Sequence, residues 1–92
     1  PSEIKTLEPG TLIDRYGPLN GYFAAPAGTP FEMRSLPADY INKPLYTFEV
    51  IKPIQVHAGI TAPWFGQPGL GIQYKFFDQI MNLWDYLRIV SF

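Results

Sequence analysis

Proline and glycine constrain the fold of this chain more than any other residue types. Ten prolines and eight glycines are spread along its 92 residues. Each proline removes a backbone hydrogen-bond donor, and glycine is unfavourable inside a helix. Few segments are therefore long enough for a regular helix, so short strands joined by turns are favoured over a helical bundle. We expect a single small α+β domain dominated by β-structure.

Alternation of apolar and polar residues predicts about six short strands, in a twisted and mostly antiparallel sheet. The predicted strands are residues 11–16, 22–25, 45–51, 54–58, 72–76 and 87–92. In the first of them, Leu12, Asp14 and Tyr16 should share one face, with Ile13 and Arg15 on the other. The first ten residues are polar and end in a turn signal, so we predict no strand there.

Helical structure is expected in only two places. Residues 38–43 can form at most one turn, because a residue that precedes proline is biased away from the helical region. Asp78 can cap a short helix. The apolar residues after it follow the i, i+3, i+4, i+7 spacing of a buried helix face: Ile80, Leu83, Trp84 and Leu87. Asn20-Gly21, between the first two predicted strands, is a strong hairpin dipeptide.

Composition argues against several classes of function. The formal net charge is −1 and the pI about 5.7, so no basic surface recommends nucleic acid or an anionic membrane as a partner. The absence of cysteine removes a disulfide scaffold, a zinc–thiolate site and a cysteine nucleophile. His57 is the one histidine, so we predict no metal site. No apolar run approaches the roughly 18 residues of a membrane-spanning helix.

The most unusual stretch is residues 63–74, with the sequence PWFGQPGLGIQY. It holds three glycines, two prolines and three aromatic residues, and no charged residue. The run from Gly66 to Gly69 predicts a tight, shaped turn. Alternation from Ile72 onward predicts a strand. Gln73 would then sit on a rigid element just beyond a loop whose glycines let a ligand approach the backbone.

Familiar catalytic motifs are missing. No serine lies in a G-x-S-x-G elbow, the carboxylates show no pairing in the sequence, and neither glycine-rich phosphate motif occurs. Instead, Arg15 and Arg34 lie beside turns and near Tyr16, Phe23 and Phe31. Arginine binds phosphate oxygens in a bidentate fashion, and aromatic faces stack on planar rings and attract cations. The pattern fits a nucleotide with a pyrophosphate and a cationic ring, although solvated arginines and core aromatics would produce it too.

Four segments in a fixed order resemble the tuberculosis necrotizing toxin family, NAD(P)⁺ glycohydrolases that include fungal surface NADases. The segments are residues 7–17 (LEPGTLIDRYG), 20–23 (NGYF), 28–37 (GTPFEMRSLP) and 62–74 (APWFGQPGLGIQY). The resemblance extends over nearly the whole chain, from about residue 7 to residue 90. Four separated motifs in order are far more specific than one glycine-rich loop.

The resemblance implies cleavage of the N-glycosidic bond between nicotinamide and ribose, with NAD⁺ or NADP⁺ as substrate and with no cofactor. By position in the motifs, Gln73 is the expected catalytic glutamine. Arg34 is expected to meet the phosphate-bearing part of the dinucleotide and to take part in catalysis. Arg15 is expected at the same pocket, and Tyr16 and Phe23 are expected to flank the nicotinamide ring.

Further substrate contacts are expected from Phe31, Gln67 and Gly71. Glu32, two residues before Arg34, is expected to form an ion pair with it. Some relatives carry a histidine before the central strand, where this chain has Leu45-Tyr46, so Tyr46 is interpreted as a strand residue.

Two other functions share parts of this pattern. ADP-ribosyl transfer to a protein or nucleic acid would use the same substrate and pocket, and a non-catalytic interaction module would keep the fold. The family implies a polymorphic toxin effector that is secreted or delivered by contact and acts in the cytoplasm of a target cell. A neutralising immunity protein would place acidic or hydrogen-bonding groups opposite Arg15 and Arg34. Because the chain begins without methionine, we expect residues 1–92 to be the C-terminal toxin domain of a longer protein.

Overall fold

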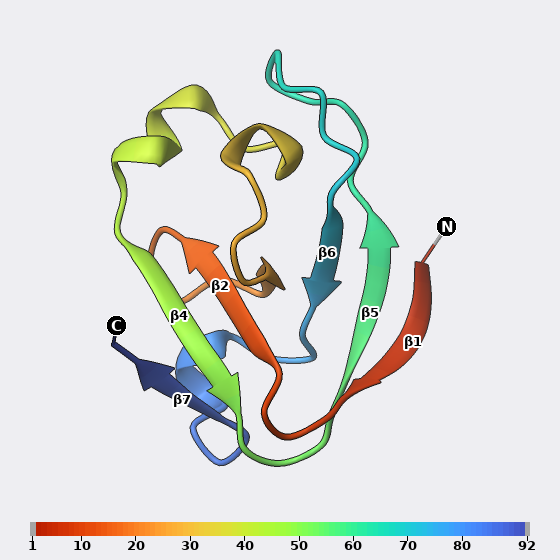
Figure 1. The fold of residues 1–92 in the computed structure, drawn as a ribbon, viewed down its shortest axis with the longest axis vertical. Helices are drawn as coiled ribbons and strands as arrows, with labels where there is room; N and C mark the ends of the chain where they lie inside the picture. The colour runs from red at the N-terminus through yellow and green to blue at the C-terminus, as the bar shows by residue number, and fades with distance from the viewer. Residues whose placement is uncertain (1, 92) are drawn as a thin grey trace.

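One antiparallel sheet of seven strands organises the molecule (Figure 1). The computed structural model describes residues 2–91. The strands are β1 (Ser2–Leu7), β2 (Leu12–Tyr16), β3 (Phe23–Pro26), β4 (Leu45–Val50), β5 (Ile54–Ile60), β6 (Ile72–Lys75) and β7 (Leu87–Val90). Their order across the sheet is β1-β5-β6-β3-β2-β4-β7, so β1 and β7 are the two edges.

Helical structure is limited to three short 3₁₀ segments: η1 (Phe31–Met33), η2 (Ala38–Asn42) and η3 (Ile80–Asn82). The first two lie in the connection from β3 to β4, at the top of Figure 1, and the third connects β6 to β7 at the opposite end. Residues 2–91 contain no α-helix, so the expectation of a β-dominated fold is right and its helical part is only approximate: the single turn expected at residues 38–43 is present as the 3₁₀ segment η2. No helix in this part of the chain is long and apolar enough to span a membrane.

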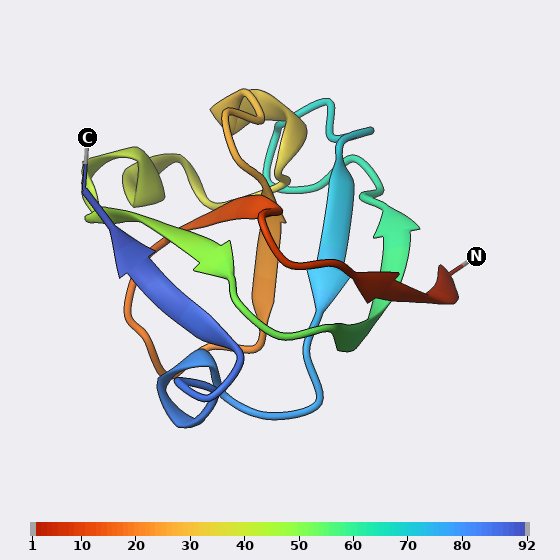
Figure 2. The same ribbon diagram turned by 60° about the horizontal axis from the view of Figure 1, so that its bottom comes forward.

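The hydrophobic core receives a side chain from every strand. One example from each is Leu7, Ile13, Ala24, Phe48, Val56, Tyr74 and Leu87. Because the two edge strands contribute to the same cluster, the sheet must curl around it, and the turned view shows this curvature (Figure 2). Ile80 and Leu83 add two buried side chains from η3 and the residue after it.

All six predicted strands are present, with their ends shifted by one or two residues; the end of the last one, at residue 92, lies outside the described residues. The strand β1 is a seventh, and the prediction that the first ten residues contain none is wrong. Of its side chains only Leu7 is buried, so the sequence shows little apolar alternation there. Pairing with β5, from Ser2 opposite Gly59 to Leu7 opposite Ile54, is what makes this segment a strand.

The helix predicted after Asp78 is wrong. The Asp78 carboxylate accepts the backbone N–H of the next residue, Gln79, but Gln79 is the N-cap of the single 3₁₀ turn that follows, and no side chain caps this turn. Leu87 pairs with Val50 across the β4–β7 ladder. Ile80 and Leu83 reach the core from η3 and the residue after it, and Leu87 reaches it from β7. The positions of these three residues in the sequence therefore resemble one face of a helix.

The sheet order brings opposite halves of the chain together. Strand β3 lies between β2 and β6, with Asp14 opposite Ala25 and Phe23 opposite Lys75. Since side chains alternate along a strand, Asp14, Phe23 and Gln73 all leave the sheet on the face opposite the core. The dipeptide Asn20-Gly21 does not form a two-residue hairpin; β2 and β3 pair as predicted, but the longer loop 17–22 joins them.

Candidate active site

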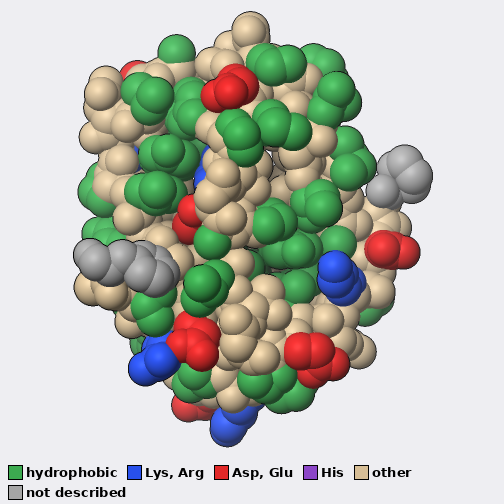
Figure 3. Space-filling view, in the orientation of Figure 1, with side chains coloured by type: hydrophobic (Ala, Val, Ile, Leu, Met, Phe, Trp, Pro, Cys, Tyr) green, Lys and Arg blue, Asp and Glu red, His purple; other side chains and the backbone are tan. Residues whose placement is uncertain are grey.

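A cleft of about 520 Å³ lies on the outer face of the sheet. Strands β2, β3 and β6 form its floor, and its walls are the η1–η2 segment and residues 61–65. The lining residues are Asp14, Arg15, Tyr16, Phe23, Ala24, Ala25, Arg34, Ser35, Leu36, Pro37, Tyr40, Thr61, Ala62, Trp64, Phe65, Ile72 and Gln73. Its volume is in the range of small-molecule sites, roughly 300–1,000 Å³. On the face shown in Figure 3, hydrophobic side chains gather in the upper half, whereas most charged ones lie in the lower half.

Residues 61–71 connect β5 to β6 as an ordered hairpin. Trp64 and Gln67 exchange backbone hydrogen bonds of 3.2 and 2.9 Å. The two residues between them, Phe65 and Gly66, both have positive φ, 52° and 72°. Positive φ at both central positions is the pattern of a type I′ turn. The tight turn therefore lies at residues 64–67, earlier in the chain than the predicted turn at 66–69.

Two glycines attach this hairpin to the η1 segment. The N–H of Gly69 donates to the carbonyl of Glu32, and that of Gly71 donates to the carbonyl of Met33, both at 3.1 Å. A Cβ on Gly69 would lie 2.6 Å from Ser35 Oγ, and one on Gly71 would lie 2.6 Å from the Met33 oxygen. Only glycine lets the two backbones approach this closely.

Side-chain hydrogen bonds and backbone strain gather at the same contact. The buried Thr61 hydroxyl donates to the Met33 carbonyl at 2.8 Å, and the Ser35 hydroxyl donates to the carbonyl of Ala62. Ser35 and Leu70 have φ of 54° and 72°. Such left-handed conformations cost non-glycine residues about 1–3 kcal/mol and cluster at ligand sites. The wall of the cleft is thus held in a strained but well-supported geometry.

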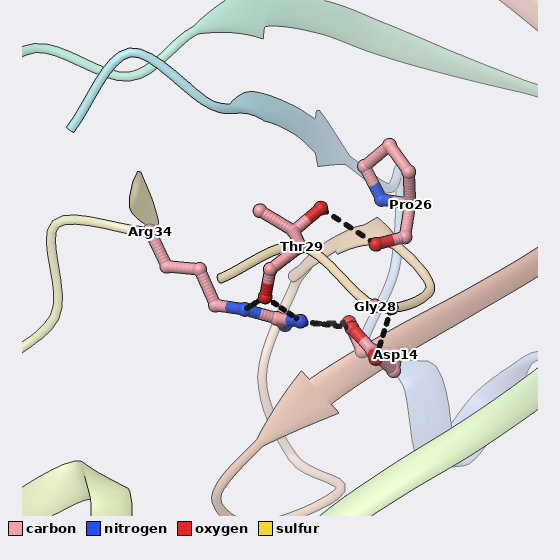
Figure 4. A network of polar contacts seen from close by, with 5 residues as sticks. All are labelled: Asp14, Pro26, Gly28, Thr29 and Arg34. Carbon is pink, nitrogen blue, oxygen red and sulfur yellow. Dashed lines mark hydrogen bonds and ion pairs between the residues drawn. The ribbon is translucent and has the colours of Figure 1, made fainter. Parts of the chain in front are cut away.

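Arg34 is the best-anchored charged residue of the cleft (Figure 4). Its Nη2 lies 2.6 Å from Asp14 Oδ1, and only 7% of its side chain and 4% of the aspartate's are exposed. Its Nε and Nη2 also donate to the Thr29 carbonyl, at 2.9 and 2.8 Å. The other carboxylate oxygen of Asp14 accepts the N–H of Gly28 at 3.0 Å.

These contacts show that the predicted ion pair between Arg34 and Glu32 is wrong. They also limit the number of Arg34 donors that can bind a ligand. The ion-pair partner of Arg34 is Asp14 from β2, not Glu32, which is exposed. A guanidinium has five N–H donors, and those on Nε and Nη2 are used within the protein. One of the two donors on Nη1 makes a long 3.5 Å hydrogen bond to the Asp14 carbonyl, which leaves at most one donor for a ligand.

Arg15 lies at the end of β2, beside the loop 17–22. Its Nε donates to the Pro18 carbonyl at 2.6 Å and its Nη1 to the Phe23 carbonyl at 2.9 Å. A Cβ on Gly21 would lie 2.0 Å from Nη2, so the loop closes tightly around the guanidinium. Burial lowers the pKa of Arg15, against a smaller opposing effect of Tyr40, but an arginine remains protonated. The structure thus shows Arg15 holding the loop that presents Phe23.

The predicted aromatic residues occupy different places. Tyr16 packs edge-on against Phe31, with ring centroids 5.2 Å apart at 89°, and the Arg34 guanidinium lies 5.0 Å from the Tyr16 ring. Phe23 lies on the neighbouring strand, with Lys75 Nζ 5.9 Å from its ring. Tyr16 and Phe23 both line the cleft, whereas Phe31 contributes to it only through its contact with Tyr16.

Gln73 lies on β6, as predicted, and its side chain is half-buried. It lines the main cleft and also a smaller adjoining hollow, of about 280 Å³, together with Phe23 and Lys75. Gln67 and Gly71 do not line the cleft: Gln67 closes the hairpin turn, and Gly71 joins the hairpin to η1. Within residues 2–91, no three His, Cys, Asp or Glu side chains gather as potential metal ligands.

Several lining residues were not predicted from the sequence. The alternation of the strand puts Asp14 on the same face as Tyr16, but no local pattern identifies it as the partner of Arg34, because the two residues come from different segments. Trp64 and Phe65 belong to the unusual 63–74 stretch, but in the sequence nothing distinguishes them from the core aromatics elsewhere in the chain. Their exposure, 61% and 56%, distinguishes them only in the structure.

Comparison with known proteins assigns the family. The model of the family described as tuberculosis necrotizing toxin matches residues 6–89. The chain belongs to this family. A curated relative, the conidial surface nicotinamide adenine dinucleotide glycohydrolase of Aspergillus fumigatus, is 38% identical over 92 aligned positions. The match covers 90% of this chain but 39% of the fungal protein, so the chain spans well under half of that relative.

Three solved structures share the fold. Tne2 in complex with Tni2 superposes with a TM-score of 0.69 at 22% identity, covering 99% of this chain and 88% of that one. Tuberculosis necrotizing toxin complexed with its immunity factor gives 0.64 at 24% identity, covering 94% and 49%. Tse6 in complex with Tsi6 gives 0.64 at 20% identity, covering 100% and 73%. At these identities the likeness shows the fold alone.

Proposed function

We propose that this chain is an NAD(P)⁺ glycohydrolase toxin domain, which hydrolyses the nicotinamide–ribose bond to give nicotinamide and ADP-ribose. The observation that carries the proposal is the meeting of Gln73 from β6, Phe23 from β3 and Arg34 from the η1 segment at one cleft. Membership of the necrotizing toxin family and likeness to a fungal NAD glycohydrolase support it.

The proposed reaction needs no acid catalyst. Nicotinamide is cationic in NAD⁺ and leaves as a neutral base, taking the electron pair of the N-glycosidic bond to its ring nitrogen. Water then bonds to C1′ of the oxocarbenium-like ribose and releases one proton. The protein's task is to hold both parts of the substrate, orient the water and exclude other water.

Each residue has a role that suits its surroundings. The half-buried Gln73 amide hydrogen-bonds a ribose hydroxyl or orients the attacking water. The remaining Nη1 donor of Arg34 binds a phosphate oxygen, while Asp14 and Thr29 hold the guanidinium in place. Tyr16 and Phe23 supply aromatic faces for the cationic ring, which such faces attract.

Measuring nicotinamide release from NAD⁺ by the purified chain tests the proposal. We expect nicotinamide and free ADP-ribose to form in equal amounts, with no label transferred to an added protein or nucleic acid. Label on the acceptor would instead favour ADP-ribosyl transfer. Folded protein with no bound inhibitor that releases no nicotinamide would exclude both enzymatic readings and leave an interaction module.

We also propose that the domain is delivered to a target cell and neutralised in its producer by an immunity protein. Three proteins that share the fold were solved in complex with a protein partner, one of them named as an immunity factor. A partner suited to this cleft would place acidic or hydrogen-bonding groups toward Arg15 and Arg34. Competition between such a partner and NAD⁺ for the cleft would test this.

A further inference from the structure

Two large aromatic side chains at the tip of the hairpin are held exposed at the cleft. Trp64 and Phe65 are 61% and 56% exposed, and both line the cleft. Their rings pack edge to face, with centroids 5.7 Å apart at 85°. Exposed aromatic surface has a hydration cost, and at Phe65 it is combined with a left-handed backbone, φ 52°. A rigid hairpin that presents two aromatic faces is a preformed stacking surface.

The cleft has two chemically different parts. One contains the buried Arg34–Asp14 pair and the polar Gln73 amide. The other contains the aromatic Trp64 and Phe65 of the hairpin tip and the apolar Leu36 and Pro37, which lie between η1 and η2. A charged or strongly polar group fits the first part, whereas a flat, neutral ring fits the second.

Gln73 and Trp64 lie at different places along one hairpin. Gln73 pairs with Gly59 in the β5–β6 ladder, and Trp64 follows Gly59 by five residues, beyond the end of β5 at Ile60. A dinucleotide carries two rings, so the reacting ring can lie at Gln73 while the second nucleotide extends toward the hairpin tip.

We propose that Trp64 and Phe65 form the subsite for the adenine base of the substrate. The inference rests on the proposed function, because it places the nicotinamide end at Gln73. Stacking on an aromatic side chain strengthens nucleotide binding by roughly 5- to 150-fold per base. These residues bind the part of the substrate that does not react, so they contribute to KM and not to the chemical step.

Kinetics of Trp64→Ala with two substrates test the assignment. We expect KM for NAD⁺ to rise about 5-fold or more with kcat nearly unchanged. Nicotinamide mononucleotide has the same scissile bond but no adenine, so its kcat/KM, or its inhibition constant against NAD⁺ if it is not cleaved, should not change. Phe77→Ala is the matched control, because Phe77 is 64% exposed and does not line the cleft. Equal losses for both compounds, or no change in KM for NAD⁺, would overturn the subsite.

Fluorescence tests the subsite without any turnover. In the Trp84→Phe protein, Trp64 is the remaining tryptophan, and we expect ADP to quench it saturably while nicotinamide and ribose 5-phosphate do not. Absence of ADP quenching would overturn the adenine subsite even if NAD⁺ is hydrolysed. Quenching by ADP in a protein that hydrolyses no NAD⁺ would uphold the subsite and reject the proposed function.

Discussion

The cleft and the outer edge of the sheet each contain an arginine–carboxylate pair, in opposite surroundings. At the cleft, Arg34 and Asp14 have side-chain exposures of 7% and 4%. At the β4–β7 edge, Arg88 and Glu49 have exposures of 63% and 28%. The chemistry of the two pairs is the same, but water can replace either partner only at the edge.

The two ion pairs differ in how firmly they orient the arginine side chain as well as in how much they stabilise the fold. At the cleft, hydrogen bonds from Arg34 to Thr29 and from Gly28 to Asp14 satisfy further donors and acceptors of the pair. Burial of charges is expensive unless such bonds are present. The buried pair therefore fixes a guanidinium at one position in the site, whereas the exposed pair can open and close at little cost.

Asp14→Asn should have the largest effect, lowering the free energy of unfolding by about 3–5 kcal/mol, because it leaves the Arg34 charge buried without a counterion. Urea denaturation measures it. Glu49→Gln is the matched control and should change stability by less than about 1 kcal/mol. Similar losses in the two variants would contradict the contrast drawn between the two pairs.

Gln73→Ala should lower kcat for NAD⁺ by about 100-fold or more, the scale of removing one positioned polar group from a reaction site. Gln55→Ala is its control, because Gln55 is exposed on the neighbouring strand β5 and does not line the cleft. Steady-state kinetics of the two folded variants measure the change in kcat. If Gln73→Ala keeps wild-type turnover, its catalytic assignment is wrong.

Gly69→Ala should destabilise the protein more than Gly66→Ala, by about 1–3 kcal/mol of additional overpacking. Both glycines have similar left-handed φ, 68° and 72°, so the backbone penalty is shared. Only at Gly69 would the new Cβ meet Ser35 and Ala62, whereas at Gly66 nothing lies within 4 Å. Thermal unfolding of the two variants measures the difference, and equal losses would show that the hairpin contact is not tightly packed.

Arg88→Ala should have the smallest effect, lowering stability by less than about 1 kcal/mol, since its partner Glu49 stays partly solvated. Raising the salt concentration should reduce even this difference, because exposed charges are screened. Urea denaturation at low and high salt tests both statements. A loss above 2 kcal/mol that persists in high salt would place this edge among the elements that stabilise the fold.

Much of the fold could be predicted because alternation in a strand is a local property. It located six strands and placed Asp14 and Tyr16 on the face opposite Ile13, which is buried in the core. Alternation does not reveal β1, because the side chains of this strand are nearly all exposed. In the segment after Asp78, core residues from η3 and from β7 happen to have the spacing of a helix face. In both cases the deciding hydrogen bonds are to a distant strand.

The sequence by itself determined the short β-elements, the absence of cysteine chemistry and the motifs that resemble the family. The tertiary structure decided which of the motif residues meet. It paired Arg34 with Asp14 instead of Glu32, used Arg15 to hold a loop, and exposed Trp64 and Phe65 at the cleft. The physical reason is that burial and ion pairing depend on contacts between distant segments, and only the order of the strands in the sheet specifies those contacts.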